Sequence, residues 1–257
     1  MRVFSKFIRN LKRDQLGSML ITKLLVPYKY RRRWAYKKML RSSTAKEKFS
    51  EIYEKNFWGS TESISGGGSE IEYTKKLREW LVNAIPKYGV QTFVDAPCGD
   101  FNWMQKVVPE VNIEYFGLDI VDSVIEENKK RHATDSIHFI VADICSDTIP
   151  SCDLLMVRDC LFHLSFDDIN KFLENLSTVD YRYLLTTTHI VEEGFNNSDI
   201  TTGHFRKIDL FSAPFNFPAN SILEQIADYK EGSSTPRKMV LIEKAYVPRS
   251  LKVLASL

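Results

Sequence analysis

Three aspartates recur along the middle of the chain at equal intervals: Asp95, Asp119 and Asp143 lie 24 residues apart. Each one closes a short apolar run of the kind that forms a buried strand. A carboxylate at the end of a strand can accept hydrogen bonds from both hydroxyls of a ribose, and another can accept from the amino group of an adenine. The pattern therefore predicts a nucleoside site at one edge of a sheet.

The turn after Asp95 argues against a ligand with a pyrophosphate. The chain turns through Pro97 and Gly99, and the next residues can open a helix whose backbone N–H groups face a ligand. Dinucleotide-binding turns carry Gly-x-Gly-x-x-Gly, whereas this turn has one glycine and adds the negative charge of Asp100. A cofactor without phosphate fits better. A dinucleotide-dependent oxidoreductase on a similar fold is the alternative.

Strand-like and helix-like patterns alternate through the region that carries these aspartates. Such alternation indicates an α/β, Rossmann-like fold with parallel strands whose carboxyl ends share one edge. We expect strands over residues 91–94, 112–118, 137–142, 153–157 and 181–188, and helices over residues 121–132 and 166–179. The second helix carries one apolar stripe, made of Ile169, Phe172, Leu173 and Leu176.

Charge is distributed unevenly along the chain. The 257 residues carry a net charge of +2, but residues 1–50 hold fifteen Lys or Arg against two acids. We therefore expect a basic arm over residues 1–49 and, since 44% of the chain is hydrophobic, one domain with a sizeable core over residues 50–257. The four cysteines show neither paired nor metal-ligand spacing, which indicates reduced thiols, a cytoplasmic protein and no metal site.

The arm has the pattern of a basic amphipathic helix. Phe4, Phe7, Ile8 and Leu11 form an apolar stripe between Lys and Arg residues. Segment 17–26 is too short and too charged to span a bilayer, and no small-residue cleavage site follows it. Three interpretations stay open: peripheral binding to the inner face of a membrane, stacking of aromatic residues on single-stranded nucleic acid, and packing on the domain or a partner. Nucleic acid is the least favoured of the three.

Four segments resemble successive motifs of the class I S-adenosylmethionine-dependent methyltransferases. They are Asp95-Ala-Pro-Cys-Gly-Asp100, Tyr115-Phe-Gly-Leu-Asp119, Val141-Ala-Asp143 and Asp153-Leu-Leu-Met-Val-Arg-Asp-Cys-Leu-Phe-His-Leu164. The resemblance covers roughly residues 60–247 and implies a mostly parallel sheet that ends in a hairpin with a final antiparallel strand. With Ser65-Gly-Gly-Gly-Ser69 and the run Asn196-x-x-Asp199-Ile200-x-x-Gly203-x-x-Arg206, the first motif is similar to that of a subgroup of glycan-modifying methyltransferases.

This resemblance implies S-adenosyl-L-methionine as the cofactor. Asp119 would bind the ribose and Asp143 the adenine, with Ile144 against the adenine ring. Asp95 and Gly99 would hold the methionine end, although a single glycine departs from the commonest form of this motif. The other implied cofactor contacts are Ala96, Pro97, Trp103, Ile120 and Arg158.

Two residues after the fourth expected strand, Asp159 and His163, are candidates for a catalytic base. Methyl transfer is an in-line displacement, so the enzyme mainly positions the acceptor and excludes water. An alcohol acceptor also benefits from a general base within hydrogen-bond reach. In this architecture the fourth strand ends beside the methyl group, which makes Asp159 the first candidate and His163 the second. The histidine could instead only orient a helix cap.

Two loops are expected to form the acceptor side. The insertion over residues 190–220 is rich in amides, carboxylates and aromatics, which suit the hydroxyls and ring faces of a sugar. Segment 57–69 is either a plain linker or a flexible lid, and Ser69 with Glu72 has capping-box spacing for a following helix. The candidate substrate contacts are Trp58, Glu62, Ser65, His189, Asp199 and Arg206, the last of which could instead grip a phosphate or carboxylate.

The sequence thus predicts a methyltransferase that acts on an oxygen of a saccharide or a related small molecule. Two alternatives stay open: the dinucleotide-dependent oxidoreductase, and a catalytically inactive methyltransferase-like adaptor whose basic arm recruits partners. The presence of Asp95, Asp119 and Asp143 argues against the adaptor, because an inactive site has no need to keep all three carboxylates.

Overall fold

The computed structural model describes Tyr36 and residues 44–251. The chain divides into two units, Met1–Ser42 and Ser43–Leu257, and the second is the subject here. The amphipathic stripe and the other features predicted for the basic arm lie outside the described residues. Helix α4 (Ala45–Glu54) belongs to the second unit, so the expected boundary at residue 49 falls inside a helix. None of the described helices is long and apolar enough to cross a membrane.

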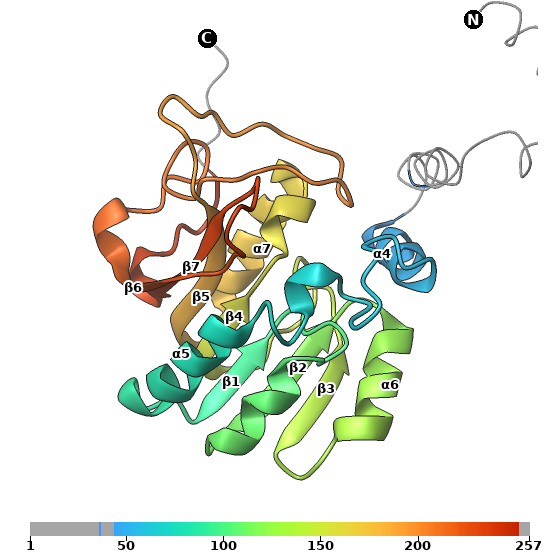
Figure 1. Cartoon of the computed structure of the whole chain (residues 1–257). Coiled ribbons are helices and arrows are strands. Elements are labelled where there is room, and N and C mark those ends of the chain that lie inside the picture. Colours follow the sequence, from blue (N-terminus) through green and yellow to red (C-terminus); the bar gives the residue numbers. More distant parts are fainter. Residues whose placement is uncertain (1–35, 37–43, 252–257) are drawn as a thin grey trace, which may run out of the picture. The chain divides into compact units, whose positions relative to one another are not determined.

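A seven-stranded sheet forms the centre of the domain (Figure 1). The first five strands are parallel and β7 is antiparallel to both of its neighbours, β5 and β6. The predicted mostly parallel, Rossmann-like sheet with an antiparallel final strand is confirmed. In the spatial order 3-2-1-4-5-7-6, the strands are β3 (Ile137–Val141), β2 (Glu114–Asp119), β1 (Thr92–Asp95), β4 (Cys152–Val157), β5 (Tyr181–His189), β7 (Arg237–Glu243) and β6 (Ile222–Ala227).

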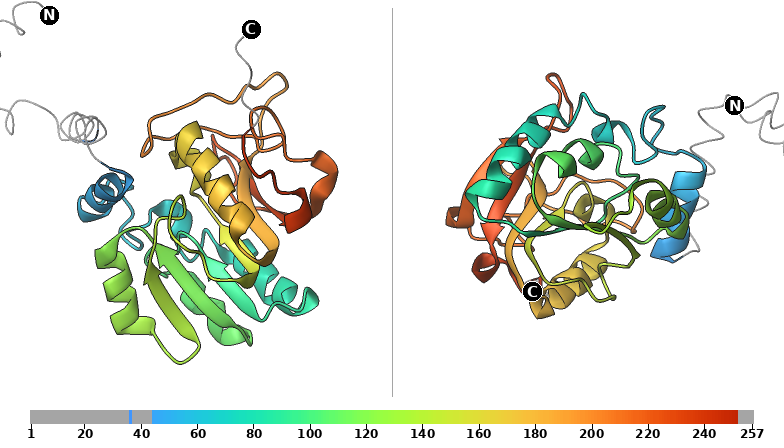
Figure 2. Two further views of the ribbon diagram at one scale, coloured as in Figure 1. Left: turned by 180° about the vertical axis from the view of Figure 1, so that it is seen from behind. Right: turned by 90° about the horizontal axis from the view of Figure 1, so that it is seen from below.

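Helices cover both faces of the sheet. Successive strand residues point to opposite sides, so each face carries apolar side chains for a helix to bury. Val94 belongs to the cluster on the side of α7 (Phe166–Thr178), whereas its neighbour Phe93 belongs to the cluster on the side of α5 (Lys75–Lys87). Seen from below, α5 and α7 lie on opposite faces (Figure 2). A further helix, α6 (Asp122–His132), follows β2 and contributes buried Ile125 to the α5 side.

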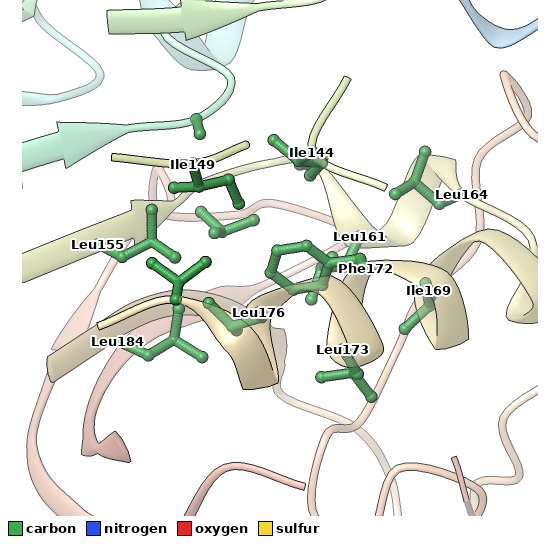
Figure 3. Close-up of a cluster of buried hydrophobic side chains, with 14 of the residues drawn as sticks. Ile144, Ile149, Leu155, Leu161, Leu164, Ile169, Phe172, Leu173, Leu176 and Leu184 are labelled. Carbon is green, nitrogen blue, oxygen red and sulfur yellow. The ribbon is translucent and has the colours of Figure 1, made fainter. Parts of the chain in front are cut away.

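The apolar stripe of α7 packs where the sequence predicts it. Its four members, Ile169, Phe172, Leu173 and Leu176, are all buried. They pack in one cluster with residues of the sheet such as Leu155 and Leu184, and with Ile144 after β3 (Figure 3). Ser165 caps the helix by accepting a hydrogen bond from the backbone N–H of Asp168 at 3.1 Å. The helix thereby fixes the direction of the segment that enters it from the end of β4.

The predicted capping box at Ser69 and Glu72 is wrong. Ser69 ends a short 3₁₀ turn, Gly67–Ser69, and α5 begins only at Lys75. Tertiary contacts hold the intervening backbone outside the helix: the Asn102 amide donates to the carbonyl of Ser69 at 3.0 Å, and the Glu62 carboxylate accepts from the N–H of Ile71 at 2.6 Å. Local cap spacing is a weak signal, and these two bonds override it.

Candidate active site

A cleft of about 690 Å³ opens at the carboxyl ends of β1, β2, β3 and β4. The residues after β1 to β4 that line it are Pro97, Leu118, Asp119, Ile120, Ala142, Asp143, Ile144, Cys145, Asp159, Cys160, His163, Leu164 and Asp168. The remaining lining residues come from the N-terminal side of the domain: Ala45, Phe49, Tyr53 and Trp58.

The Asp119 carboxylate is fixed by two backbone N–H groups. Gly99 donates to its Oδ2 at 3.2 Å and Val121 to its Oδ1 at 3.0 Å. Burial raises the pKa of Asp119 to about 6, although both N–H groups favour the ionised form. The carboxylate is thus mainly ionised at neutral pH and can accept hydrogen bonds from ligand hydroxyls.

Gly99 has a φ of +56°, and a Cβ there would overlap the Ser65 hydroxyl, so this turn needs glycine.

The part of the cleft beside Asp119 can hold a flat apolar ring. Ile120 and Ile144 line it from the segments after β2 and β3. Asp143 lies beside them, and its Oδ1 accepts from the N–H of Cys145 at 2.9 Å. A carboxylate at the rim of an apolar slot is suited to an exocyclic amino group. The sequence predicts adenine contacts for Asp143 and Ile144 and a further cofactor contact for Ile120.

The loop before the first turn docks on that turn and does not hang free. Ser63 Oγ and the N–H of Ile64 both donate to Asp100 Oδ2 at 2.9 Å. Ser65 Oγ accepts from the N–H of Asp100 at 3.0 Å. The negative charge of Asp100 is therefore taken up by this loop and is not presented to a ligand. Ser65, predicted to contact substrate, holds the first turn in place.

Besides Gly99, four of the predicted cofactor residues do not line the cleft. Asp95 is buried and accepts from the Tyr115 hydroxyl at 2.8 Å, and burial raises the pKa of Asp95 to about 7. Ala96 donates its N–H to the carbonyl of Met156 in β4. Trp103 lies under the Arg158 guanidinium, with 5.2 Å from Cζ to the ring centroid. Their recorded contacts are with the protein's own residues.

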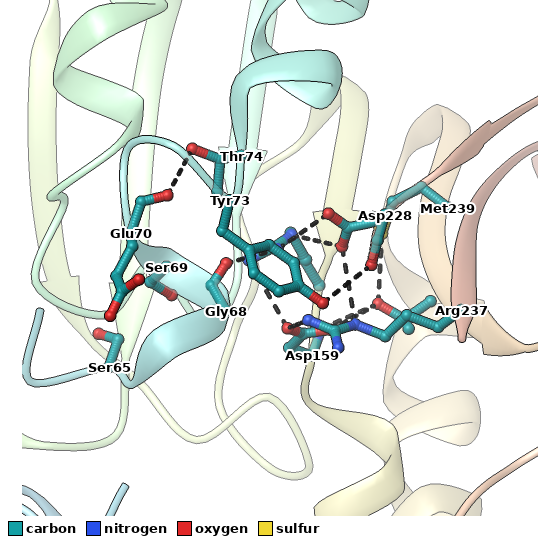
Figure 4. A network of polar contacts seen from close by, with 12 residues as sticks. Ser65, Gly68, Ser69, Glu70, Tyr73, Thr74, Asp159, Asp228, Arg237 and Met239 are labelled. Atoms are coloured by element: carbon teal, nitrogen blue, oxygen red, sulfur yellow. Dashed lines mark hydrogen bonds and ion pairs between the residues drawn. The ribbon is translucent and has the colours of Figure 1, made fainter. Parts of the chain in front are cut away.

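A buried network of two arginines and two aspartates lies next to the cleft (Figure 4). Arg158 donates from Nε and Nη2 to the Asp228 carboxylate at 2.9 and 3.0 Å, and from Nη2 to the carbonyl of Gly68 at 2.7 Å. Arg237 of β7 binds Asp159, which has a φ of +52°. A Cβ on Gly68 would lie 2.9 Å from both Arg237 and Asp159, so the loop approaches the network closely only because this residue is glycine.

The network keeps Asp159 ionised. Burial alone would raise the pKa of this carboxyl, but the positive charges of Arg158 and Arg237 outweigh burial and lower the pKa. The N–H of Asp159 donates to Thr187 Oγ1 at 2.9 Å, which fixes its unusual backbone conformation. Asp159 lines the cleft as a fixed negative charge, and a carboxylate held in this way is a weak base.

His163 is the basic group that faces the cleft. It ends a 3₁₀ turn, Leu161–His163, and its Nδ1 donates to the carbonyl of His204 at 2.7 Å. Burial lowers the pKa of His163 below its usual value. A neutral ring whose Nδ1 carries the proton has its lone pair on Nε2. The centroid of its ring lies 5.9 Å from that of Trp58 and 6.0 Å from that of Phe205.

The other predicted substrate residues do not line the cleft. Asp199 Oδ1 accepts from the N–H of Phe166 at 2.7 Å, at the start of α7. Arg206 donates to the carbonyl of Leu164 and is buried, which lowers its pKa to about 10. These contacts fold the insertion onto the N-terminus of α7, the edge that carries His163.

His189 and Glu62 also have structural partners. His189 is buried in β5, its Nδ1 accepts from the N–H of Ile208 at 3.2 Å, and burial lowers its pKa to about 4. Glu62 accepts from the N–H of Ile71 and, at 2.8 Å, from the Asn102 amide. Among residues 36 and 44–251, no three side chains of His, Cys, Asp or Glu gather as metal ligands.

Several residues at the site are absent from the sequence predictions. Phe49 and Tyr53 line the cleft from α4, and Arg237 and Asp228 hold the ion network. Thr44 and Glu47 have capping-box spacing, which predicts the start of α4. Both bonds of the box form: each side chain accepts from the backbone N–H of the other residue. No comparable sequence signal marks Arg237, because its proximity to Asp159 depends on how β7 joins the sheet.

The chain matches no protein-family model and no curated protein. Solved structures do match its fold. Magnesium protoporphyrin IX methyltransferase from Synechocystis PCC 6803, crystallised with SAM, is 10% identical with a TM-score of 0.56 over 79% of this chain and 98% of that chain. The N-methyltransferase NodS from Bradyrhizobium japonicum WM9, in complex with S-adenosyl-L-homocysteine, is 11% identical with a TM-score of 0.56 over 76% and 97%.

Human N-acetylserotonin methyltransferase, in complex with SAM, is 14% identical with a TM-score of 0.53 over 89% of this chain and 70% of that chain. At such identities the likeness concerns the fold alone. The chain therefore has the Rossmann-like fold of the S-adenosylmethionine-dependent methyltransferases.

Proposed function

We propose that this chain is an S-adenosylmethionine-dependent methyltransferase that methylates an oxygen of a saccharide or a related small molecule. One observation carries the proposal: a single cleft has Asp119 and Asp143 at its nucleoside end and a neutral histidine, His163, at the other. The fold supports the cofactor part of the proposal, since the solved structures that share it include methyltransferases with S-adenosylmethionine or its product bound.

The residues of the cleft fit this cofactor. Asp119 would accept from the ribose hydroxyls, Asp143 from the adenine amino group, and Ile120 and Ile144 would pack on the adenine. The turn Pro97-Cys98-Gly99 would lie along the methionine end. The bound cofactor supplies an electrophilic methyl group on a sulfonium. No phosphate has to be accommodated, which agrees with the carboxylates that surround the first turn.

His163 is the group we propose as general base, ahead of Asp159. Its Nδ1–H is committed to the carbonyl of His204, so Nε2 is free to take the proton of an acceptor hydroxyl. Asp159 is near enough to raise the pKa of the histidine. It therefore stabilises the imidazolium as the proton arrives, while remaining ionised itself. Asp159 would also offer its carboxylate to a second hydroxyl of the acceptor.

The aromatic rings around His163 support a saccharide acceptor. Trp58 lines the cleft, and Phe205, which is 50% exposed, presents a ring from the insertion. Sugar rings pack their apolar faces on such rings while carboxylates and amides bind their hydroxyls. Arg206, the side chain that could have selected an anionic acceptor, is buried and does not line the cleft, and its Nη1 donates to the carbonyl of Leu164.

Mass spectrometry tests the proposed acceptor class. The enzyme is incubated with S-adenosylmethionine that carries a labelled methyl group and with a panel of nucleotide sugars and oligosaccharides. We expect the label in an ether-linked methyl group on a sugar hydroxyl. Label found only on a nitrogen or a carboxylate of other small molecules would contradict O-methylation of a saccharide and leave the cofactor assignment intact.

We further propose that the basic segment before α4 binds an anionic membrane surface. Residues 1–50 carry fifteen Lys or Arg against two acids, and each basic residue near such a surface contributes about 1 kcal/mol. Removing residues 1–40 should abolish co-sedimentation with phosphatidylserine vesicles while S-adenosylhomocysteine affinity stays unchanged. Salt at 0.5 M should also release the full-length protein from the vesicles, since the screening length of the charges falls to about 4 Å. Absence of vesicle binding by the full-length protein would overturn this proposal.

A further inference from the structure

Helix α4 faces the cleft with one of its sides. Ala45, Phe49 and Tyr53 are spaced four residues apart, so they lie along one stripe of the helix. All three line the cleft, together with Asp119, Ile120 and Ile144 of the sheet edge. Figure 1 shows the helix beyond the carboxyl ends of β2 and β3. The cleft is therefore bounded by the sheet edge on one side and by α4 on the other.

The position of α4 is set by apolar packing more than by charge. Phe49 packs both with the cluster that contains Ile144 and with the cluster formed by Tyr53, Val121 and Val124. Ile52 is fully buried beside them. The ion pair between Lys46 and Asp122 of α6 is exposed and contributes little. The side of the helix that meets the cleft is thus apolar except for one hydroxyl.

That hydroxyl belongs to Tyr53, which meets the turn that holds the Asp119 carboxylate. It lies 3.3 Å from Ser65 Oγ and 3.3 Å from the position that a Cβ on Gly99 would take. The Tyr53 ring also packs edge-on against Trp58, with 5.1 Å between centroids. Trp58 in turn lies beside His163. A continuous aromatic wall therefore runs from the nucleoside end of the cleft to the proposed base.

From this geometry we infer that α4 is a wall of the cofactor site, with Phe49 covering the nucleobase end and Tyr53 the ribose and the adjoining methionine. The inference rests on the proposed cofactor. Phe49 and Tyr53 would thus both contact the cofactor from α4, the helix that follows the basic segment in the sequence. Covering the open side of the ligand buries its apolar surface and excludes water from the reacting sulfonium, which the sheet edge alone cannot do.

Calorimetry with S-adenosylhomocysteine tests the wall in the full-length protein. Phe49→Ala and Tyr53→Ala should each weaken binding by about 10- to 100-fold, because each removes a ring from the ligand's exposed side. Phe211→Ala serves as a matched control: Phe211 is half-buried like Phe49 but lies outside the cleft lining, so affinity should stay within about twofold. Thermal unfolding without ligand confirms that each variant is folded at the temperature of the titration.

Hydrogen exchange gives a second readout that does not depend on substitutions. S-adenosylhomocysteine should slow exchange of the backbone amides of α4 in the wild-type protein, because the bound ligand holds the helix closed. Both Ala variants binding as tightly as wild type, or α4 amides that gain no protection, would overturn the inference. If the wild-type protein fails to bind S-adenosylhomocysteine at all, the proposed cofactor is what fails.

Discussion

Replacing His163 by asparagine is expected to lower turnover by about 10²- to 10⁴-fold, the contribution of a general base. Asparagine keeps a donor near Nδ1 for the carbonyl of His204 and removes the Nε2 lone pair. The structure of the turn should therefore survive while the basicity is lost. Affinity for S-adenosylhomocysteine, measured by calorimetry, should change little, which separates a loss of chemistry from a loss of the cofactor.

The pH profile sharpens this prediction. The pKa of His163 lies below its usual value of 6.5. We therefore expect kcat/KM to rise with pH and then level off, with the midpoint of the rise below pH 6.5. That acidic limb should disappear in His163→Asn. Asp159→Asn should cost less, because this carboxylate is held by Arg237 and Arg158 and stabilises the imidazolium. If Asp159→Asn is inactive while His163→Asn keeps near-normal turnover, the two roles are reversed.

Asp228→Asn is expected to destabilise the folded protein by about 3–5 kcal/mol, the usual cost of breaking a buried ion pair from one side. Asp228 is buried and receives two hydrogen bonds from Arg158, which is itself buried. The amide has a similar shape but removes the charge that compensates the guanidinium. Chemical denaturation measures the loss as a change in the free energy of unfolding.

Asp122→Asn is the matched control for this experiment. Asp122 is paired with Lys46, but both side chains are largely exposed, so solvent already screens the pair. The free energy of unfolding of this variant should be close to that of wild type. An Asp228→Asn protein as stable as wild type would show that the network tolerates the loss of this carboxylate, and the argument that the network fixes Asp159 would lose its basis.

The sheet edge is the part of the molecule that is most predictable from sequence. Asp119 and Asp143 close short apolar runs that are typical of strands, and parallel strands bring their carboxyl ends to one edge. The stripe of α7 is equally predictable, because four apolar residues at helical spacing must face the sheet. In both cases the signal is local, so the residues that carry it are close together in the sequence.

The roles of the loop residues depend on tertiary partners that no local pattern reveals. Asp199 and Arg206 have the chemistry of substrate contacts, yet both are used to fold the insertion onto the start of α7. Ser65 is likewise used to bind the turn at Asp100. Tyr53 shows the converse: it lines the cleft from α4, whereas the residues around it, with three Lys and three Glu over residues 46–55, give no sign of a ligand site. Contacts between segments far apart in sequence decide each of these cases.

Binding of the cofactor product is the most direct test of the account. Calorimetry should show that S-adenosylhomocysteine binds the wild-type protein and that NAD does not. Asp119→Ala should weaken S-adenosylhomocysteine binding by about 1.5–3 kcal/mol, the contribution of hydrogen bonds to a charged group. Asp135→Ala, an exposed aspartate outside the cleft, should leave it unchanged. Binding of NAD without binding of S-adenosylhomocysteine would contradict the proposed function and favour the dinucleotide-dependent oxidoreductase.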